Sequence, residues 1–289
     1  IEYAMMVLFF LMMAQMVILT LPRALECCER VRLVLDHTPE IEDLVLRDPE
    51  DRKRPEVLAF RDVSFRFQDA EEDTLGHLNF VCRRGETTAI IGGTGSGKST
   101  VASLILRFHD VTDGAIELNG TDIRNMPQKF LRDHLDYVQQ KAWLFSGTIA
   151  ENLRYSRPDA AEEELMHAAD VALAGDFIRS LPDGLNSFVA QGGVNFSGGQ
   201  KQRLSIARAL VKRPELYIFD DSFSALDFKT DAALRRALAA ETKDAAVLII
   251  AQRVSSIRHA DQIVVLHEGH RTLLEKKGAY AALYDCQFE

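Results

Sequence analysis

The sequence has few cysteines, a single tryptophan and no excess of positive charge. It holds 34 lysine and arginine residues against 43 aspartate and glutamate residues, which gives a formal net charge of -9 over 289 residues. A chain this acidic is a poor candidate for nucleic-acid binding as its main activity. The four cysteines follow no spacing typical of metal ligands or of a disulfide framework, which favours free thiols in a reducing cytosol. They are Cys27, Cys28, Cys82 and Cys286.

The start of the chain lacks the features of a secretory signal. It carries Glu2 in place of a basic segment, and no small-residue cleavage site follows the first apolar run. The first residue is Ile1 rather than methionine, so we expect a fragment or a missing start. The sequence also shows no internal repeat and no low-complexity tract.

Residues 3–21 form the one long apolar run near the start, interrupted only by Gln15 and Thr20. This length is close to what a helix needs to span a bilayer. Basic residues follow the run, which places the chain after it in the cytoplasm: Arg23, Arg30 and Arg32. We therefore predict a transmembrane helix with a cytosolic extension over residues 1–36. A buried helix of a soluble core is the competing interpretation, and acylation of Cys27 and Cys28 is a further possibility.

A glycine-rich stretch fits the pattern G-x-x-x-x-G-K-[ST], which is typical of a phosphate-binding P-loop. An apolar strand is predicted before it at 87–91, and a helix after it at 100–106. Glycines let backbone N–H groups close on phosphate oxygens, and the helix N-terminus adds the positive end of its dipole. A glycine-rich connector in an ordinary α/β domain is the alternative. The residues are Gly92, Gly93, Thr94, Gly95, Ser96, Gly97, Lys98, Ser99 and Thr100.

The rest of the chain alternates between predicted strands and helices. Prolines and charges indicate a linker over residues 37–56. Residues 63–67 alternate as a strand, and 78–82 is predicted to pair with it. Two short apolar runs without alternation, 216–219 and 247–251, indicate parallel strands in a sheet covered on both faces. Further strands are predicted at 115–120 and 263–266, with a helix-rich segment at 160–181.

Two later motifs point to the same phosphate chemistry. Ser197 can cap a helix whose first residues are glycines, which makes a second anion site. The predicted strand at 216–219 ends in two carboxylates, Asp220 and Asp221. A carboxylate at the carboxyl end of such a strand lies beside the ligand site of an open α/β sheet.

Taken together, these motifs resemble the nucleotide-binding domain of an ATP-binding cassette (ABC) transporter, of the exporter type that fuses a membrane domain to the ATPase. The resemblance covers residues 57–289, and residues 1–36 resemble the last transmembrane helix of such an exporter. It implies an α/β fold with a P-loop (RecA-like) parallel sheet core and an antiparallel β subdomain. It also implies a helical subdomain at about 141–200.

The resemblance implies roles for single residues. Lys98 would reach the β- and γ-phosphates of ATP, Phe67 would stack on adenine, and Gln252 would contact the γ-phosphate. Magnesium (Mg2+) would be held by Ser99, Gln140 and Asp220. The family binds two ATP molecules between two cassettes, so each site joins one P-loop to the other chain's signature and to an interface loop. In this sequence the signature and interface residues are Ser197, Gly198, Gly199, Gln200 and Asp227. Without the P-loop context, Phe67 would be interpreted as a half-exposed aromatic residue of a strand, and Gln140 as a polar loop residue.

Two positions depart from the family pattern at one ATP site. Asp221 stands where the catalytic residue is usually glutamate, and it is shorter by one C–C bond, about 1.5 Å. A base displaced by around an angstrom can cost roughly a hundredfold in rate. Gln252 stands where histidine is usual, and an amide cannot become cationic. We therefore expect Asp221, Gln252 and Lys98 to form a slow site in one half of a heterodimeric exporter; a homodimer in which aspartate suffices is the alternative.

Smaller departures lie elsewhere. Gln139 stands where proline is common and Gln191 where exporters often have glutamate, and the segment 267–273 is shorter than usual. A regulatory ATP-binding half with little turnover and a soluble cassette ATPase remain alternative functions.

The expectation is an ATPase subunit in the inner or plasma membrane, multi-pass in its full-length form, with a cytoplasmic nucleotide-binding domain. We expect residues 140–147 to transmit nucleotide binding to the membrane domain. The expected partners are a second half-transporter and a small-molecule, lipid or peptide cargo, with no nucleic acid.

Overall fold

The computed structural model describes residues 1–39, 41–43, 54–93, 95–224, 226–252, 257–267 and 270–273. Thr94 of the P-loop and residues 268–269 of the short segment lie outside this set. The chain divides into two units, Ile1–Glu42 and Asp43–Glu289. The predicted domain boundaries at residues 36 and 56 stay predictions.

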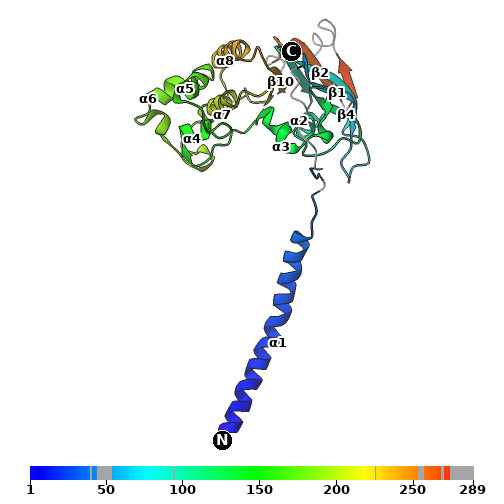
Figure 1. Cartoon of the computed structure of the whole chain (residues 1–289), viewed down its shortest axis with the longest axis vertical. Helices are drawn as coiled ribbons and strands as arrows, with labels where there is room; N and C mark the ends of the chain where they lie inside the picture. The colour runs from blue at the N-terminus through cyan, green and yellow to red at the C-terminus, as the bar shows by residue number, and fades with distance from the viewer. Residues whose placement is uncertain are drawn as a thin grey trace. The chain divides into compact units, whose positions relative to one another are not determined.

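Helix α1 (Glu2–Leu35) makes up nearly all of the first unit (Figure 1). It continues through Pro22 to Leu35, as predicted for a membrane helix with an extension. Its most apolar 18-residue window has a mean hydropathy of 2.4, so by length and composition it can cross a membrane. Its large apolar side chains are exposed rather than packed in a core, which favours the membrane interpretation over a buried core helix.

A parallel sheet forms the centre of the second unit. Its strands run in the spatial order β11 (Gln262–His267), β3 (Thr87–Gly92), β10 (Ala246–Ala251), β9 (Leu216–Asp220) and β6 (Leu135–Val138). All neighbouring pairs among these five strands are parallel, which confirms the prediction made from the unalternating apolar runs. Because parallel strands share one direction, the residues that follow β3, β9 and β10 meet at one edge.

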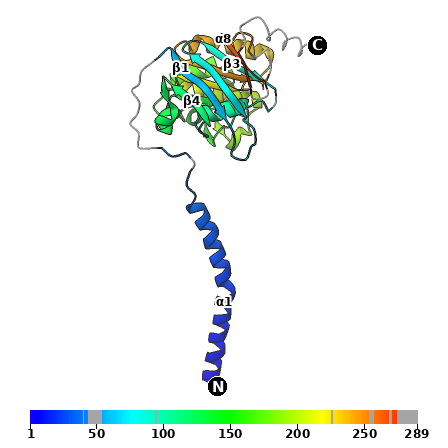
Figure 2. The same cartoon turned by 90° about the vertical axis from the view of Figure 1, so that its right-hand side faces the viewer.

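An antiparallel sheet continues from the parallel one (Figure 2). Strand β1 (Glu56–Phe65) pairs with β2 (Leu75–Arg83) and with β4 (Asp113–Leu118), and β5 (Thr121–Asp122) follows β4. Strand β12 (His270–Leu273) pairs with β11 and meets β2 at one position, which joins the two sheets. The predicted strand at 63–67 is wrong at both ends. Strand β1 starts at Glu56 and ends at Phe65, because the Phe67 carbonyl already accepts the Ala70 N–H in a turn.

Helices cover both faces of the parallel sheet. Alternate residues of β10 show this, since Leu248 and Ile250 pack in one apolar cluster with α2 (Lys98–Ile105) and α3 (Gln128–Asp133). Ile249 packs in the other cluster, with α7 (Gly198–Lys212) and α8 (Phe228–Glu241). The strands are therefore buried on both faces, which explains why their sequences carry no polar alternation.

A group of short helices lies beside α7, away from β1, β2 and β4 (Figure 1). It contains α4 (Ile149–Leu153), α5 (Glu162–Val171) and α6 (Gly175–Ser180). Two short strands, β7 (Gly147–Thr148) and β8 (Phe188–Val189), pair antiparallel at its base. This group corresponds to the helix-rich segment predicted from the sequence.

Candidate functional site

The P-loop lies between β3, which ends at Gly92, and α2, which begins at Lys98. Gly97 has φ +86, and a Cβ there would lie 2.7 Å from a Leu75 methyl carbon, so the turn requires glycine. Lys98 is only 8% exposed, and its Nζ donates hydrogen bonds to the carbonyls of Gly92 (2.6 Å) and Gly93. The ammonium group therefore lies inside the loop that the sequence predicts to hold phosphates.

The pKa of Lys98 is lowered because the side chain is buried, although the negative charges of Asp220 and Asp221 partly raise it again. These carboxylates come from the end of β9, separated from β3 in the sheet by β10 alone. The sheet thus brings the predicted lysine and both predicted carboxylates into one electrostatic environment.

Asp220 ends β9 and accepts a hydrogen bond from a residue that the sequence analysis did not assign to the site. The Tyr137 hydroxyl on β6 donates to Asp220 Oδ2 at 2.7 Å. Burial raises the pKa of Asp220; the Tyr137 hydrogen bond lowers it, and the neighbouring charge of Asp221 raises it. Tyr137 lies three residues before Gln140, but no sequence pattern marks it as a partner of a carboxylate 83 residues away.

Asp221 adopts a left-handed backbone conformation, φ 44, which is uncommon for a residue with a Cβ. The conformation is held by two hydrogen bonds: its N–H donates to the Ile250 carbonyl (2.8 Å), and its carbonyl accepts from Ser224 Oγ (2.7 Å). Its Oδ2 accepts a hydrogen bond from Gln140 Nε2 at 2.9 Å. Strained backbone of this kind concentrates at functional sites, and here it aims the carboxylate at Gln140.

Two further buried side chains hold the segment that leads to Gln140. Ser222 Oγ donates to the Val138 carbonyl at 2.6 Å, and Gln202 of α7 donates through Nε2 to the Gln139 carbonyl at 3.2 Å. Gln202 is 1% exposed. The sequence analysis missed both residues, since each acts through a backbone carbonyl far away in the chain.

The other predicted residues have these positions. Gln252 directly follows β10, at the edge where the P-loop and Asp220 lie. Phe67 is 43% exposed, and its ring packs at 81° against Phe65 with centroids 4.8 Å apart. Asp227 caps α8 by accepting from the N–H groups of Lys229 and Thr230. The Thr230 hydroxyl also donates to its Oδ2 at 2.7 Å, and this bond, followed by the Thr230 N–H bond, lowers the pKa of Asp227.

The signature residues begin α7. Ser197 Oγ accepts from the Gln200 N–H (3.2 Å), and the Gln200 side chain accepts from the Ser197 N–H (2.9 Å), which confirms the predicted cap. Gly198 and Gly199 form the first helical positions. Within the described part of the chain, side-chain hydrogen bonds made by the signature residues stay inside α7, and none joins them to the P-loop.

The available donors suit a hard cation. The Ser99 hydroxyl, the Gln140 amide oxygen and the Asp220 carboxylate are all oxygen ligands, as magnesium prefers. Over the described ranges no group of three or more histidine, cysteine, aspartate or glutamate side chains is placed to hold a metal.

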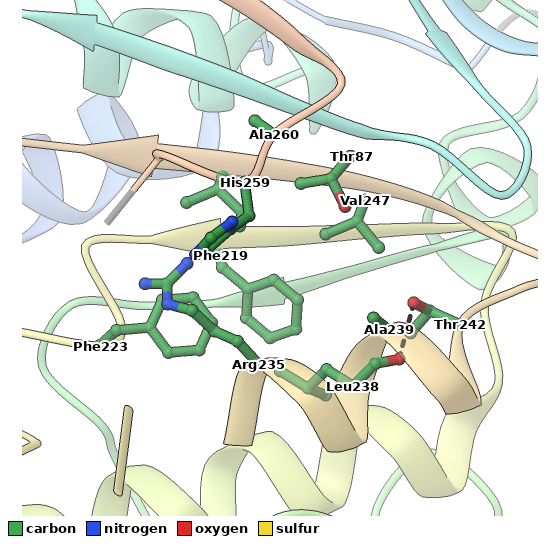
Figure 3. Close-up of a pocket in the computed structure, with 11 residues that line it drawn as sticks. Thr87, Phe219, Phe223, Arg235, Leu238, Ala239, Thr242, Val247, His259 and Ala260 are labelled. Atoms are coloured by element: carbon green, nitrogen blue, oxygen red, sulfur yellow. Dashed lines mark hydrogen bonds between the residues drawn. The ribbon is translucent and has the colours of Figure 1, made fainter. Parts of the chain in front are cut away.

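A separate cavity of about 100 Å3 lies between α8 and the strands β3, β9 and β10 (Figure 3). The Arg235 guanidinium lies 4.1 Å from the centre of the Phe223 ring on its wall, and Thr242 Oγ1 donates to the Leu238 carbonyl at 2.9 Å. None of its lining residues belongs to the predicted nucleotide site.

Comparison with known proteins identifies the family. The family model described as ABC transporter matches residues 75–224, slightly more than half of the chain. The chain belongs to the ABC transporter family. The match includes the P-loop, both carboxylates and the signature, so this ABC chain carries the ATP-binding domain of an ATPase family.

Relatives of this ABC chain include exporters. An uncharacterised ABC transporter ATP-binding protein of Mycobacterium tuberculosis is 42% identical over 97% of this chain and 50% of its own length. The ATP-dependent lipid A-core flippase of Chromobacterium violaceum is 40% identical over 92% of this chain and 46% of its own length. A solved bacterial Atm1-family ABC exporter with ATP bound superposes with a TM-score of 0.83 at 34% identity. That match covers 92% of this chain and 47% of the exporter chain.

The comparisons confirm the exporter type and the α/β fold class. The ABC chain spans about half the length of the curated relatives it matches.

Proposed function

We propose that this chain is the ATP-binding end of one half of an ABC exporter, and that its own site binds MgATP but hydrolyses it slowly. The observation that carries the proposal is the pair of departures at that site, Asp221 and Gln252. The Asp221 carboxylate is short and already accepts a hydrogen bond from Gln140 at 2.9 Å. A general base must reach the proton that it removes, so a retracted carboxylate favours slow attack by water.

The remaining residues have binding roles in this proposal. Lys98, the P-loop N–H groups from Gly93 to Thr100 and the N-terminus of α2 hold the phosphates. Ser99, Gln140 and Asp220 hold magnesium, which supplies charge neutralisation at the β- and γ-phosphates. Phe67 stacks on adenine, and the Gln252 amide donates to the γ-phosphate without carrying a proton to it.

The signature serves the other site of the pair. Its cap and glycines are intact, so α7 presents free N–H groups at its N-terminus for the phosphates of an ATP held by a second chain. Asp227 is placed at the start of α8 to cross the same interface. Two ATP molecules between two cassettes would close them, and release of phosphate would open them. The proposal favours a heterodimer, in which the second chain carries at its own site the glutamate and histidine that this chain lacks.

An exposed aromatic surface follows Gln140 and suits contact with the membrane domain. It consists of Trp143, Phe145 and Tyr155, with Phe145 and Tyr155 stacked at 4.6 Å. Trp143 is 52% exposed, and the guanidinium of Arg208 lies 6.0 Å from the centre of the Phe145 ring. Exposed aromatic and arginine side chains are typical of energetically important protein contacts. We propose that this surface receives a cytosolic segment of the membrane domain and couples it to Gln140.

The test is restoration of the usual residues. The double variant Asp221→Glu, Gln252→His should raise single-site ATP turnover by about tenfold or more, because it returns the base to full reach. The measurement uses the full-length protein with its partner, whose own P-loop lysine is replaced by alanine so that one site remains active. Adding Lys98→Ala must abolish the gain. Turnover that stays at the parent rate would contradict the proposal.

The homodimer alternative has its own test. Full-length protein purified without a partner should bind ATP and hydrolyse it negligibly. Brisk turnover that Lys98→Ala removes would mean that Asp221 suffices as the base and that two copies of this chain form the transporter.

A further inference from the structure

A histidine that no sequence motif marks lies against the predicted adenine platform. The rings of His109 and Phe67 have centroids 5.5 Å apart at an interplanar angle of 82°, and the rings of His109 and Phe65 are 5.6 Å apart. With the Phe65–Phe67 contact, the three rings form a closed cluster at the end of β1. Edge-to-face geometry of this kind is favourable between aromatic rings.

The cluster matters because the Phe67 side chain is only partly buried. It lies beyond the last residue of β1, where the sheet no longer holds the chain, and it is 43% exposed. An unsupported ring loses rotamer freedom when it stacks on a ligand, and this cost reduces affinity. Rings packed against Phe67 remove part of this cost before ATP arrives.

His109 is itself firmly placed. It follows the P-loop helix α2, where Arg107 turns the chain at φ 52 and buries its guanidinium, which donates to the Met126 carbonyl at 3.2 Å. Beyond His109, the Thr112 N–H donates to the Ser64 carbonyl (2.9 Å), and Thr112 Oγ1 accepts from the Arg66 N–H (3.1 Å). The segment that carries His109 is therefore fastened to the residues on either side of Phe65.

We propose that His109 is a positioning residue for ATP binding, which orients Phe67 for stacking on adenine. One helix then organises both ends of the nucleotide: α2 starts at the phosphate loop, and the turn after it supports the base platform. The inference rests on the proposed role of Phe67. It predicts that His109 affects recognition of the base and leaves recognition of the phosphates unchanged.

The experiment compares two ligands on the full-length protein: MgATP, and magnesium tripolyphosphate, which has no base. Affinities are measured by displacement of a fluorescent ATP analogue. His109→Ala should weaken MgATP binding by about three- to tenfold, the range expected for one aromatic contact. Its affinity for tripolyphosphate should stay within about twofold of the parent value, since the P-loop is untouched.

Three matched variants complete the test. His109→Phe keeps a ring and should restore ATP affinity. His134→Ala removes a histidine that packs on Phe130 at 4.3 Å elsewhere in the domain, and should leave both affinities unchanged. In a Phe67→Ala background, His109→Ala should cause no further loss, because it acts through Phe67.

Equal weakening of both ligands by His109→Ala would overturn the proposal, and so would an additive loss in the Phe67→Ala background. If Phe67→Ala itself left ATP affinity unchanged, the adenine platform would lie elsewhere. In that case the role proposed for Phe67 fails, rather than the contact between the two rings.

Discussion

At the scale of single residues, two opposing effects act on the pKa of Asp220. Burial raises the pKa of Asp220, and the hydroxyl of Tyr137 works against that rise by donating to Oδ2. In its proposed role Asp220 must be ionised to attract magnesium, so metal binding should be lost as the pH falls through this raised pKa. Removing a hydrogen bond to the charged form raises the pKa further and moves that loss to higher pH.

Tyr137→Phe should therefore weaken magnesium-dependent ATP binding, and more strongly at pH 6 than at pH 8. The effect should grow as the pH falls, up to the factor of about ten that a hydrogen bond to a charged group can contribute. The measurement is a magnesium titration of ATP binding at both pH values, with the parent protein measured at each. Tyr155→Phe, on the exposed aromatic surface, is the control. Equal weakening at the two pH values would show that Tyr137 does not act through the ionisation of Asp220.

At the scale of elements, the segment after Gln140 and the segment before the signature form one structural unit. Strands β7 and β8 pair the two segments, and the Gly192 N–H donates to the Leu144 carbonyl at 2.9 Å. The Trp143 ring lies over Gly192, where a Cβ would come within 3.2 Å of it. Gly192 also has φ +70, so the turn favours glycine, and an added Cβ would press closely on the ring.

Gly192→Ala should lower the melting temperature of the full-length protein through strain of about 1–2 kcal/mol in a left-handed backbone, with a further contribution from the tight contact with Trp143. Gly184→Ala is a matched control, since Gly184 has φ +51 but open space around its Cβ position. The larger loss should belong to Gly192→Ala, and Trp143→Leu should relieve part of it. Equal losses from the two glycines would mean that the contact with Trp143 imposes no constraint.

At the scale of the whole molecule, one chain is proposed to serve two unequal sites. In that proposal its P-loop belongs to the slow site and its signature to the fast one. A hydrogen bond connects the helix that begins with the signature to the segment before Gln140: Gln202 of α7 donates to the carbonyl of Gln139.

A substitution in the signature should therefore cost more than one in the P-loop. In the full-length heterodimer, Gly199→Asp places a negative charge where phosphate is expected, and should lower steady-state turnover by about a hundredfold. Lys98→Ala should lower it by no more than about tenfold, because the partner's P-loop is intact. Steady-state phosphate release measures both. A larger loss from Lys98→Ala than from Gly199→Asp would reverse the assignment of the sites.

Local chemistry made much of this protein predictable from the sequence. The P-loop glycines, the Ser197 cap and the unalternating strands depend on a few neighbouring residues, and each carries its own physical signal. The strands at 216–219 and 247–251 were predicted as parallel for this reason, and the structure confirms them. Ends of elements were misjudged, as at Phe67, and the strand β6 and the helix α8 were not predicted at all, because tertiary contacts determine where a strand stops and where other elements form.

The sequence by itself determined the family, the fold class and the residue types that are proposed to face the nucleotide. Tertiary structure alone decided how these side chains are held. Gln140 lies 81 residues from Asp221, and Tyr137 lies 83 residues from Asp220, so no local pattern could reveal either hydrogen bond. The left-handed backbone of Asp221 and the ring contact of His109 likewise exist only after distant strands and helices have packed. Neighbouring residues determine local propensity, whereas the orientation of a side chain depends on partners that folding brings together.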